Sequence, residues 1–500
     1  MIKKTITDNK NILFILFAYT ILLLFFCSKM SPLYPLNEWS DINLYFNMGK
    51  AMFNGRTIYT EAFDHKGPLI FFIYGIGYLI SNTSFLGMYL IEVILWTIML
   101  FAVYFTARLY LDKVYALIVA LALPLLILSH TQEGGSAEEF IAIFESVSLL
   151  FFIRYFKDKN VSAHNPKIML VHGLMCCMTL FIKMNLVIFW FFPLLAIFIN
   201  LILKKEYRNL IYNALAFIAG VLIIALPVCI YFIANNALTE AWDVYVVLNR
   251  SYARIGSALE IIELLAVRFY LRLRFETIEF LIILLGAFFF PYKYIGNRLG
   301  AISISLSFIS LFTFIFITPG YVYYYDIPYT IFGIPGLIVL CKYIRLGSGK
   351  SVYIIAASLF LVLSINLKSF FGLQINEVIK RETPKTYVDE FEEIITKEKN
   401  PTLMNLGLDL GNSLFTRLNI VPNVKYFISP NLRYDFYPVM REEQSKYIEN
   451  KDIQFFIICG ASEEYNYYIN LPALQNNYTM VYEAFDSSTK VYHYLYKRND

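Results

Sequence analysis

The chain has 500 residues and a net charge of only +4, and 58% of its residues are hydrophobic while 16% are charged. Soluble domains average about 45–50% apolar and about 25% charged residues. The composition therefore predicts a polytopic α-helical membrane protein, and the absence of any basic tract excludes nucleic acid as a partner. The six cysteines are scattered, a pattern that indicates neither a disulfide framework nor a structural metal site.

Long apolar runs mark the candidate membrane spans. A hydrocarbon core about 30 Å thick needs roughly 20 apolar residues per helix. The first run lacks a small-residue cleavage site and is predicted to be a retained signal anchor. The candidate runs are 11–30, 68–82, 85–107, 114–130, 139–156, 168–184, 186–203, 210–234, 277–291, 299–318, 329–344 and 351–367.

The distribution of basic residues predicts the topology. Lys3, Lys4 and Lys10 indicate a cytoplasmic N-terminus. If the short, glycine-containing run 68–82 is re-entrant or interfacial, about eleven spans remain and the basic clusters between them fall in the cytoplasm. The C-terminus is then extracytoplasmic. The regions predicted to meet on the external face are 31–84, 130–138, 235–276 and 319–328.

The first external loop carries Glu38 and Asp41. Ser40 and Asp41 open a helical pattern that reaches Phe53, which predicts an amphipathic helix on the outer leaflet with Asp41 in its first turn. A carboxylate beside a membrane segment is a functional candidate. Two interpretations stay open for Asp41: a general base, or a charge that stabilises the helix N-terminus.

A Gly-Pro turn in the same loop is predicted to bring Lys66 to the membrane interface. Lys66 either anchors the next helix by snorkelling or neutralises a lipid phosphate, with His65 as a nearby hydrogen-bond donor. In the second external region, Ser136, Glu138 and Glu139 form a capping arrangement at a helix start. The alternative for the two glutamates is binding of sugar hydroxyls or a second acid–base role.

The third external region is rich in arginine, against the positive-inside trend. Arg250, Arg268 and Arg272 are candidates for holding a phosphorylated lipid, and anionic headgroups are the alternative partner. Arg268 and Arg272 are expected to share a helix face. A further possibility is that 258–276 dips into the membrane.

The fourth external region crowds tyrosines. Tyr324 and Tyr325 either belong to an interfacial aromatic belt or cover a sugar-donor site. Lys183 lies at membrane depth and indicates a polar interior. Beyond residue 368 hydropathy falls, so we expect a transmembrane domain over 1–368 and a small soluble α/β domain over 369–500. Its expected strands are 402–408, 453–459, 478–485 and 491–496, and its expected helices are 384–397 and 440–450.

Taken in order, these motifs resemble those of the GT-C membrane glycosyltransferases, over roughly residues 1–345. The chain is similar to the branch with protein O-mannosyltransferases and lipid A aminoarabinose transferase, and to bacterial relatives that decorate cell-surface polymers. The motifs are the acid before a helix, Phe63-Asp64-His65-Lys66-Gly67-Pro68-Leu69, Gly134-Gly135-Ser136-Ala137-Glu138-Glu139 and Tyr324-Tyr325-Asp326-Ile327-Pro328.

This resemblance implies that Asp41 is the base and that Lys66 contacts the donor phosphate. The family often has Asp-Glu where this chain has Ser40-Asp41, so Glu38 is the alternative base. The family also often carries His or Arg before the final tyrosine of the outer segment, where this chain has Tyr324, which leaves a phosphate role for that segment open.

The function implied is inverting transfer of a sugar from a polyprenyl-phosphate-linked donor to a polysaccharide, teichoic acid, glycolipid or protein on the outer face of the cell membrane. The scheme requires no cofactor, and a divalent metal stays an open alternative. The rival functions are a lipid-linked-sugar transporter or flippase, a polysaccharide polymerase or ligase, and a binding protein whose C-terminal domain is the active part. The charges gather on the external side and no internal repeat is visible, which favours the enzyme over a transporter.

Overall fold

The computed structural model describes residues 9–34, 37, 39–131, 134–343, 386–407, 409–429, 432–462, 464–486 and 490–499. Contacts divide the chain into two compact units. The first unit comprises Met1–Ser28, Ile91–Tyr231 and Asn249–Leu373, and the second comprises Lys29–Leu90, Phe232–Leu248 and Gln374–Asp500. The predicted span 351–367 and the predicted domain boundary at 368/369 lie outside the described residues.

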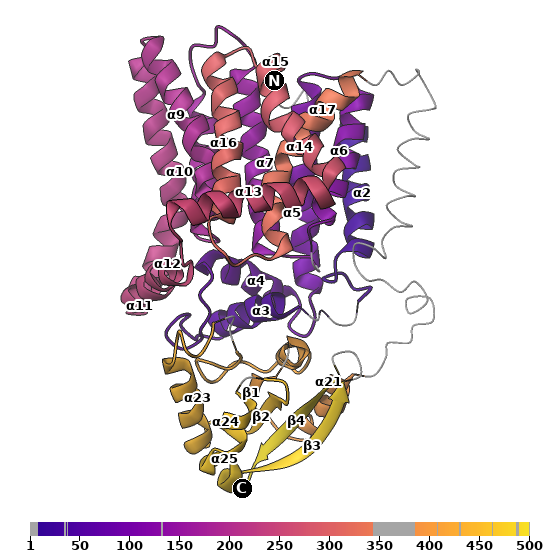
Figure 1. Ribbon diagram of the computed structural model, residues 1–500, viewed down its shortest axis with the longest axis vertical. Coiled ribbons are helices and arrows are strands. Elements are labelled where there is room, and N and C mark those ends of the chain that lie inside the picture. The colour runs from indigo at the N-terminus through magenta and orange to yellow at the C-terminus, as the bar shows by residue number, and fades with distance from the viewer. Residues whose placement is uncertain are drawn as a thin grey trace. The chain divides into compact units, whose positions relative to one another are not determined.

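The first unit is a bundle of helices (Figure 1). Within the described residues, seven helical runs are long and apolar enough to cross a membrane. They include α2, α5 and α10. The helix α7, which follows α5 and precedes α10 in the chain, carries three glutamates and is not among the seven. The helices are α2 (Lys10–Cys27), α5 (Leu86–Arg108), α6 (Lys113–Leu128), α7 (Ala137–Phe156), α8 (Pro166–Leu180), η1 (Met184–Val187), α9 (Ile188–Leu203), α10 (Tyr207–Ala234), α12 (Asn249–Tyr252), α13 (Ala258–Phe275), α14 (Thr277–Leu284), η3 (Leu285–Phe289), α15 (Phe290–Tyr294), α16 (Arg298–Phe316), η4 (Tyr323–Phe332) and α17 (Gly333–Tyr343).

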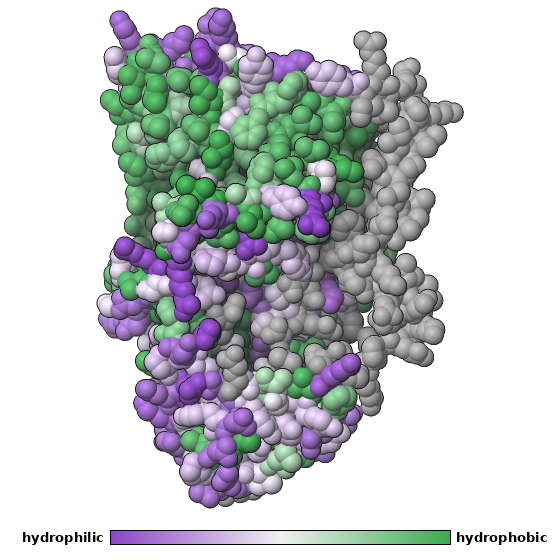
Figure 2. Space-filling model, viewed as in Figure 1, coloured by the Kyte–Doolittle hydropathy of each residue, from purple (hydrophilic) through white to green (hydrophobic). Residues whose placement is uncertain are grey.

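The surface of this unit fits a membrane protein. Figure 2 shows hydrophobic side chains spread over the face that α9, α10 and α16 present to the viewer. On α10 the side chains of Ile211, Leu215 and Ile230 are about 60% exposed. Side chains of this kind are exposed on a helix that is solvated by lipid rather than by water. The prediction of a polytopic α-helical membrane protein is confirmed.

The predicted external loop 235–276 is largely helical. It contains α11 (Leu238–Trp242), η2 (Asp243–Leu248), α12 and α13. A capping box between Ser257 and Glu260 starts α13, which Figure 1 draws crosswise to α16. Its Leu259, Ile262 and Tyr270 are exposed. An exposed apolar face on a helix that also carries arginines is characteristic of an interfacial helix. Because apolar residues and arginines are mixed along α13, the sequence indicated no membrane span there.

The second unit contains the first-loop helices α3 (Ser40–Phe53) and α4 (Pro68–Ile80). The 13 residues of α4 extend roughly 20 Å at 1.5 Å per residue, too short for a core of about 30 Å. This agrees with the interpretation of 68–82 as a segment that does not span. The two helices cross at glycines, because a Cβ on Gly49 would lie 2.4 Å from the backbone nitrogen of Gly75.

The prediction for the environment of α3 is wrong. An amphipathic helix on the leaflet would expose its polar face, yet every residue from Ile42 to Ala51 is buried, including Asn43, Asn47 and Lys50. Besides α4, the helix contacts η5 (Asp409–Asn412) and α22 (Ser413–Arg417) from the C-terminal part of the chain. Protein, rather than water or lipid headgroups, therefore covers the polar side of α3.

The C-terminal part of the second unit is the predicted small α/β fold. Its sheet has the strand order β1-β2-β4-β3. β1 (Leu403–Leu406) pairs in parallel with β2 (Phe455–Cys459), and β4 (Val491–Arg498) runs antiparallel to β2 and to β3 (Tyr478–Asp486). The helices are α21 (Tyr387–Ile395), α22, α23 (Val439–Glu449), α24 (Tyr465–Ile469) and α25 (Pro472–Asn477).

Candidate functional site

The second unit brings the predicted base and the predicted phosphate-binding lysine together. Lys66 Nζ lies 3.8 Å from Asp41 Oδ2, and the two side chains are 20% and 14% exposed. The hydroxyl of Tyr45, one turn further along α3, donates to Asp41 Oδ2 at 3.4 Å. A carboxylate and an ammonium group are thus held side by side and remain partly accessible to a ligand.

The turn that carries Lys66 is fixed from both sides. The hydroxyl of Tyr59 donates to the Lys66 carbonyl at 2.6 Å, and the backbone of Phe63 donates to the Lys425 carbonyl at 3.1 Å. The Phe63 ring stacks on Tyr437 with a centroid separation of 5.5 Å. These contacts hold the backbone in place on either side of residues 64 and 65. They therefore determine the position from which the Lys66 side chain extends.

Asp64 and His65 contact each other within the turn that carries Lys66. Asp64 is buried and accepts the His65 backbone N–H at 2.7 Å, and His65 Nδ1 lies 3.2 Å from the same carboxylate oxygen. Burial alone would raise the pKa of Asp64, but the hydrogen bonds from His65 and the charges of His65 and Lys66 hold it below the ordinary value. The structure therefore turns one ring nitrogen of His65 toward Asp64.

A buried lysine links α3 to the C-terminal part of the same unit. Lys50 is fully buried, and its Nζ donates to the carbonyls of Phe415 at 2.5 Å and Ile420 at 3.4 Å. Asn412 donates to Ser40 Oγ at 3.2 Å, next to Asp41. The helix with Asp41 and the turn with Lys66 are therefore both attached to the C-terminal α/β fold.

The Lys50 attachment predicts a pH-dependent stability. Burial lowers the pKa of Lys50 to about 7, whereas an unfolded lysine titrates at about 10.4. Between these values the unfolded chain binds the additional proton, so the free energy of unfolding rises with pH from about 7 and this contribution is lost as the pH falls back to 7. From pH 7 to pH 9 the wild type should gain about 2–3 kcal/mol more than Lys50→Met. Thermal unfolding in detergent at both pH values measures it, and equal gains in the two proteins would contradict the assignment.

In the first unit, three residues noted in the sequence come together. Lys183 Nζ lies 2.5 Å from Glu138 Oε1 and 3.6 Å from the centroid of the Tyr325 ring. Lys183 stands between α8 and η1, where the helix is interrupted, and its side chain is 27% exposed. The break explains how a lysine inside two adjoining apolar runs reaches an acidic partner at the start of α7.

Glu139 takes the capping role that the sequence left open. Its side chain accepts the Ser136 backbone N–H at 3.2 Å, and Ser136 Oγ accepts the Glu139 backbone N–H at 3.1 Å. The preceding Gly134 and Gly135 have φ values of +88° and +78°, which favour glycine because L side chains rarely adopt them. Glu138, rather than Glu139, is the glutamate of this motif that contacts a cation.

The predicted arginines meet on a tyrosine. Arg268 and Arg272 lie over the ring of Tyr321, with their guanidinium carbons 4.4 and 4.8 Å from its centroid. Arg272 is buried, and its Nε lies 2.5 Å from Asp326 Oδ2. Arg250 is exposed on α12. Arg272 therefore already has a carboxylate partner within the protein.

Other predicted residues are placed as follows. Tyr324 is buried, with 6% of its surface exposed, next to the half-buried Tyr325. Glu38, the alternative base, lies outside the described residues. Asp41 and Lys66 belong to the second unit, whereas Glu138, Lys183, Tyr325 and the arginines belong to the first.

Several polar residues are buried although no sequence pattern indicated it. Lys50 looked like a polar position on an amphipathic helix, and Asp326 was one acid in a tyrosine-rich segment. His130 is the last residue of the apolar run 114–130. Burial raises the pKa of Glu276 to about 7. A histidine at the end of a candidate span is the sequence signal that could have been followed.

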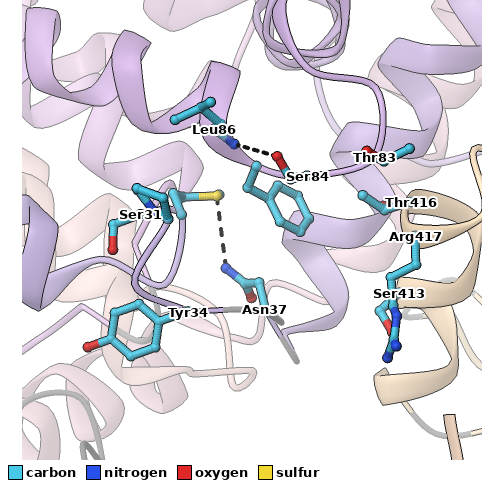
Figure 3. Close-up of a pocket in the computed structure, with 12 residues that line it drawn as sticks. Ser31, Tyr34, Asn37, Thr83, Ser84, Leu86, Ser413, Thr416 and Arg417 are labelled. Carbon is cyan, nitrogen blue, oxygen red and sulfur yellow. Dashed lines mark hydrogen bonds between the residues drawn. The ribbon is translucent and has the colours of Figure 1, made fainter. Parts of the chain in front are cut away.

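The second unit also contains a small polar pocket (Figure 3). Its volume of about 40 Å³ is enough for ordered water but not for a sugar ring. Figure 3 shows Ser31, Asn37, Ser84 and Arg417 around it. Arg417 is already paired with Asp389 at 2.8 Å. The pocket is therefore better suited to water than to a substrate.

Comparison with known proteins agrees with this architecture. The sequence profile of the family described as dolichyl-phosphate-mannose-protein mannosyltransferase matches residues 65–232, about a third of the chain. No curated protein matches by sequence.

Among solved structures, ArnT from Cupriavidus metallidurans bound to undecaprenyl phosphate is similar, with a TM-score of 0.59 and 13% identity over 98% of each chain. The oligosaccharyltransferase of Archaeoglobus fulgidus in its apo form has a TM-score of 0.50 and 14% identity, over 97% of this chain and 74% of that one. The resemblance stated from the sequence motifs is confirmed at the level of fold. The chain has the fold of the GT-C membrane glycosyltransferases.

Proposed function

We propose that the protein is an inverting glycosyltransferase that moves a sugar from a polyprenyl-phosphate-linked donor to a hydroxyl of a cell-surface polysaccharide, teichoic acid, glycolipid or protein. The reaction takes place on the outer face of the membrane, with the N-terminus in the cytoplasm and the C-terminal α/β fold outside. The fold, the mannosyltransferase profile and the undecaprenyl phosphate bound to the similar ArnT support a lipid-linked donor.

The observation that carries the proposal is the pair of Asp41 and Lys66, 3.8 Å apart and partly exposed. Transfer from a sugar phosphate needs a group that accepts the proton of the attacking hydroxyl. It also needs a cation where negative charge develops on the departing phosphate. One loop supplies both groups.

The proposed step is a single displacement. The acceptor oxygen attacks the anomeric carbon and forms the new glycosidic bond, while the bond between that carbon and the phosphate oxygen breaks. The polyprenyl phosphate leaves with the electron pair beside Lys66, and Asp41 takes the proton of the acceptor hydroxyl. Because the leaving group is an anionic phosphate, no general acid is required. Glu38 is the alternative base.

Proteoliposomes loaded with a radiolabelled polyprenyl-phosphate sugar test the proposal. We expect wild-type protein to release polyprenyl phosphate and to label an extract of cell-surface acceptors. Lys446→Met, which removes an exposed ammonium group paired with Glu443, should transfer at the wild-type rate. Movement of intact donor across the bilayer without its consumption would instead establish a transporter, and chain elongation of the lipid-linked glycan would establish a polymerase.

A further inference from the structure

The first unit contains a compact group of side chains of the kinds that bind metal ions. His130 lies two residues after the end of α6, Glu276 separates α13 from α14, and Asp326 lies in η4. One candidate ligand atom from each of the three lies within 4.8 Å of the others. The side chains of His130 and Asp326 are 3% and 0% exposed, and that of Glu276 is 25% exposed. Three separate parts of the chain thus deliver one imidazole and two carboxylates to one place.

Two polar atoms of this group lack a hydrogen-bond partner among the described residues. They are His130 Nε2 and Asp326 Oδ1, and both are buried. His130 Nε2 faces Glu276 Oε2 at 3.8 Å and Glu279 Oε2 at 3.9 Å. These separations exceed the about 2.7–3.2 Å of a hydrogen bond. Since buried polar atoms are nearly always satisfied, an unpartnered imidazole nitrogen between two carboxylates points to a missing cation.

The separations are close to those of two ligands on one metal ion. Bonds from zinc to nitrogen and oxygen are about 2.0–2.2 Å long, so two ligand atoms in a tetrahedral site lie roughly 3.3–3.6 Å apart. The distances from His130 Nε2 to Glu276 and Glu279 are 3.8 and 3.9 Å, so a movement of a few tenths of an ångström brings each pair to that spacing. Imidazole and carboxylate ligands together favour a transition metal such as zinc over calcium or magnesium, which prefer oxygen alone.

The guanidinium of Arg272 contacts only part of each carboxylate in the group. Arg272 lies 2.5 Å from Asp326 Oδ2 and 3.4 Å from Glu276 Oε1. The other oxygen of Glu276 faces His130, and the other oxygen of Asp326 is the unpartnered one. The arginine therefore uses one oxygen of each carboxylate and leaves the second available.

We propose that His130, Glu276 and Asp326 bind a divalent transition-metal ion, with Glu279 beside them. The ion fastens the end of α6 to η4 and to the junction of α13 with α14. It therefore holds in place the segment that carries Tyr325. The site is distinct from the Asp41 and Lys66 pair, and the proposal does not depend on the sugar-transfer function.

Metal content and stability test the site. Protein purified with a tag that contains no histidine is stripped with EDTA, incubated with Zn²⁺, desalted and measured by inductively coupled plasma mass spectrometry. We expect about one zinc per chain and a higher unfolding temperature with zinc than after stripping. Glu276→Gln, which keeps the size of the side chain, should lower zinc affinity at least about 10-fold and remove the zinc-induced stabilisation.

His172 provides a matched control. It is fully buried on α8, and neither of its ring nitrogens has a hydrogen-bond partner among the residues that the structure describes. Its ring stacks on Phe152 rather than facing carboxylates. His172→Gln should retain one zinc per chain, whereas His130→Gln should lose it. The proposal is overturned if wild-type protein keeps no more zinc than Glu276→Gln, or if the two histidine variants lose zinc equally.

Discussion

Replacing Asp41 by asparagine is expected to lower the rate of sugar transfer about 10²- to 10⁴-fold, the range associated with loss of a general base. Asparagine keeps the size of the side chain and can still accept the hydrogen bond from Tyr45. The lower rate would therefore reflect the missing proton acceptor, not a change in the shape of the loop. The effect should appear in kcat, measured with radiolabelled donor in proteoliposomes at saturating acceptor.

Glu61→Gln is the matched control for this substitution. Glu61 lies on the same loop and its carboxylate accepts the Thr57 backbone N–H at 2.7 Å, a contact that glutamine can keep. Full transfer is expected from this variant. If Asp41→Asn transferred sugar at the wild-type rate while Glu38→Gln did not, the base would be Glu38.

Replacing Lys66 by methionine is expected to lower kcat/KM for the donor about 10²- to 10³-fold. This is the size of effect seen when one group that stabilises developing charge is removed. Methionine retains most of the aliphatic stem, and the contacts of the turn through Tyr59 and Phe63 involve the backbone of the loop. The turn should therefore keep its position while the positive charge disappears.

The double variant separates a joint role from two independent ones. Residues that act in one step are strongly non-additive, so Asp41→Asn with Lys66→Met should be little slower than the slower single variant. Lys66→Arg should recover part of the rate, because arginine also binds phosphate. A Lys66→Met protein with wild-type kcat/KM would refute the assignment of Lys66 to the donor phosphate.

The candidate pair could be found in the sequence because it is local. Asp41 opens a helix and Lys66 immediately precedes a Gly-Pro turn about 25 residues later. One loop therefore holds both, and charge patterning predicted which loop. The pairing distance of 3.8 Å was not predictable, because Tyr59, Phe63 and the C-terminal Lys425 and Tyr437 determine the course of the turn.

For the arginines, the sequence predicted the shared helix face but not the partner. The i,i+4 spacing correctly placed Arg268 and Arg272 on one helix face, where both lie over Tyr321. Their charge suggested a phosphate ligand, yet Arg272 is paired with Asp326, 54 positions further along the chain. No local pattern indicates that partner, because α13 and η4 meet only when the helices pack.

The sequence by itself determined the membrane class, most of the helices, the small α/β fold and the order of the motifs that indicate a GT-C protein. These properties follow from hydropathy, periodicity and short turns, which act over a few to about 20 residues. Only the tertiary structure decided which polar side chains are buried and with whom. Lys50 contacts the carbonyl of Phe415, 365 positions away, and His130 meets Glu276 and Asp326 from two other segments. The physical reason is that the burial of a polar group is stable only with partners, and those partners are brought together by packing between distant segments.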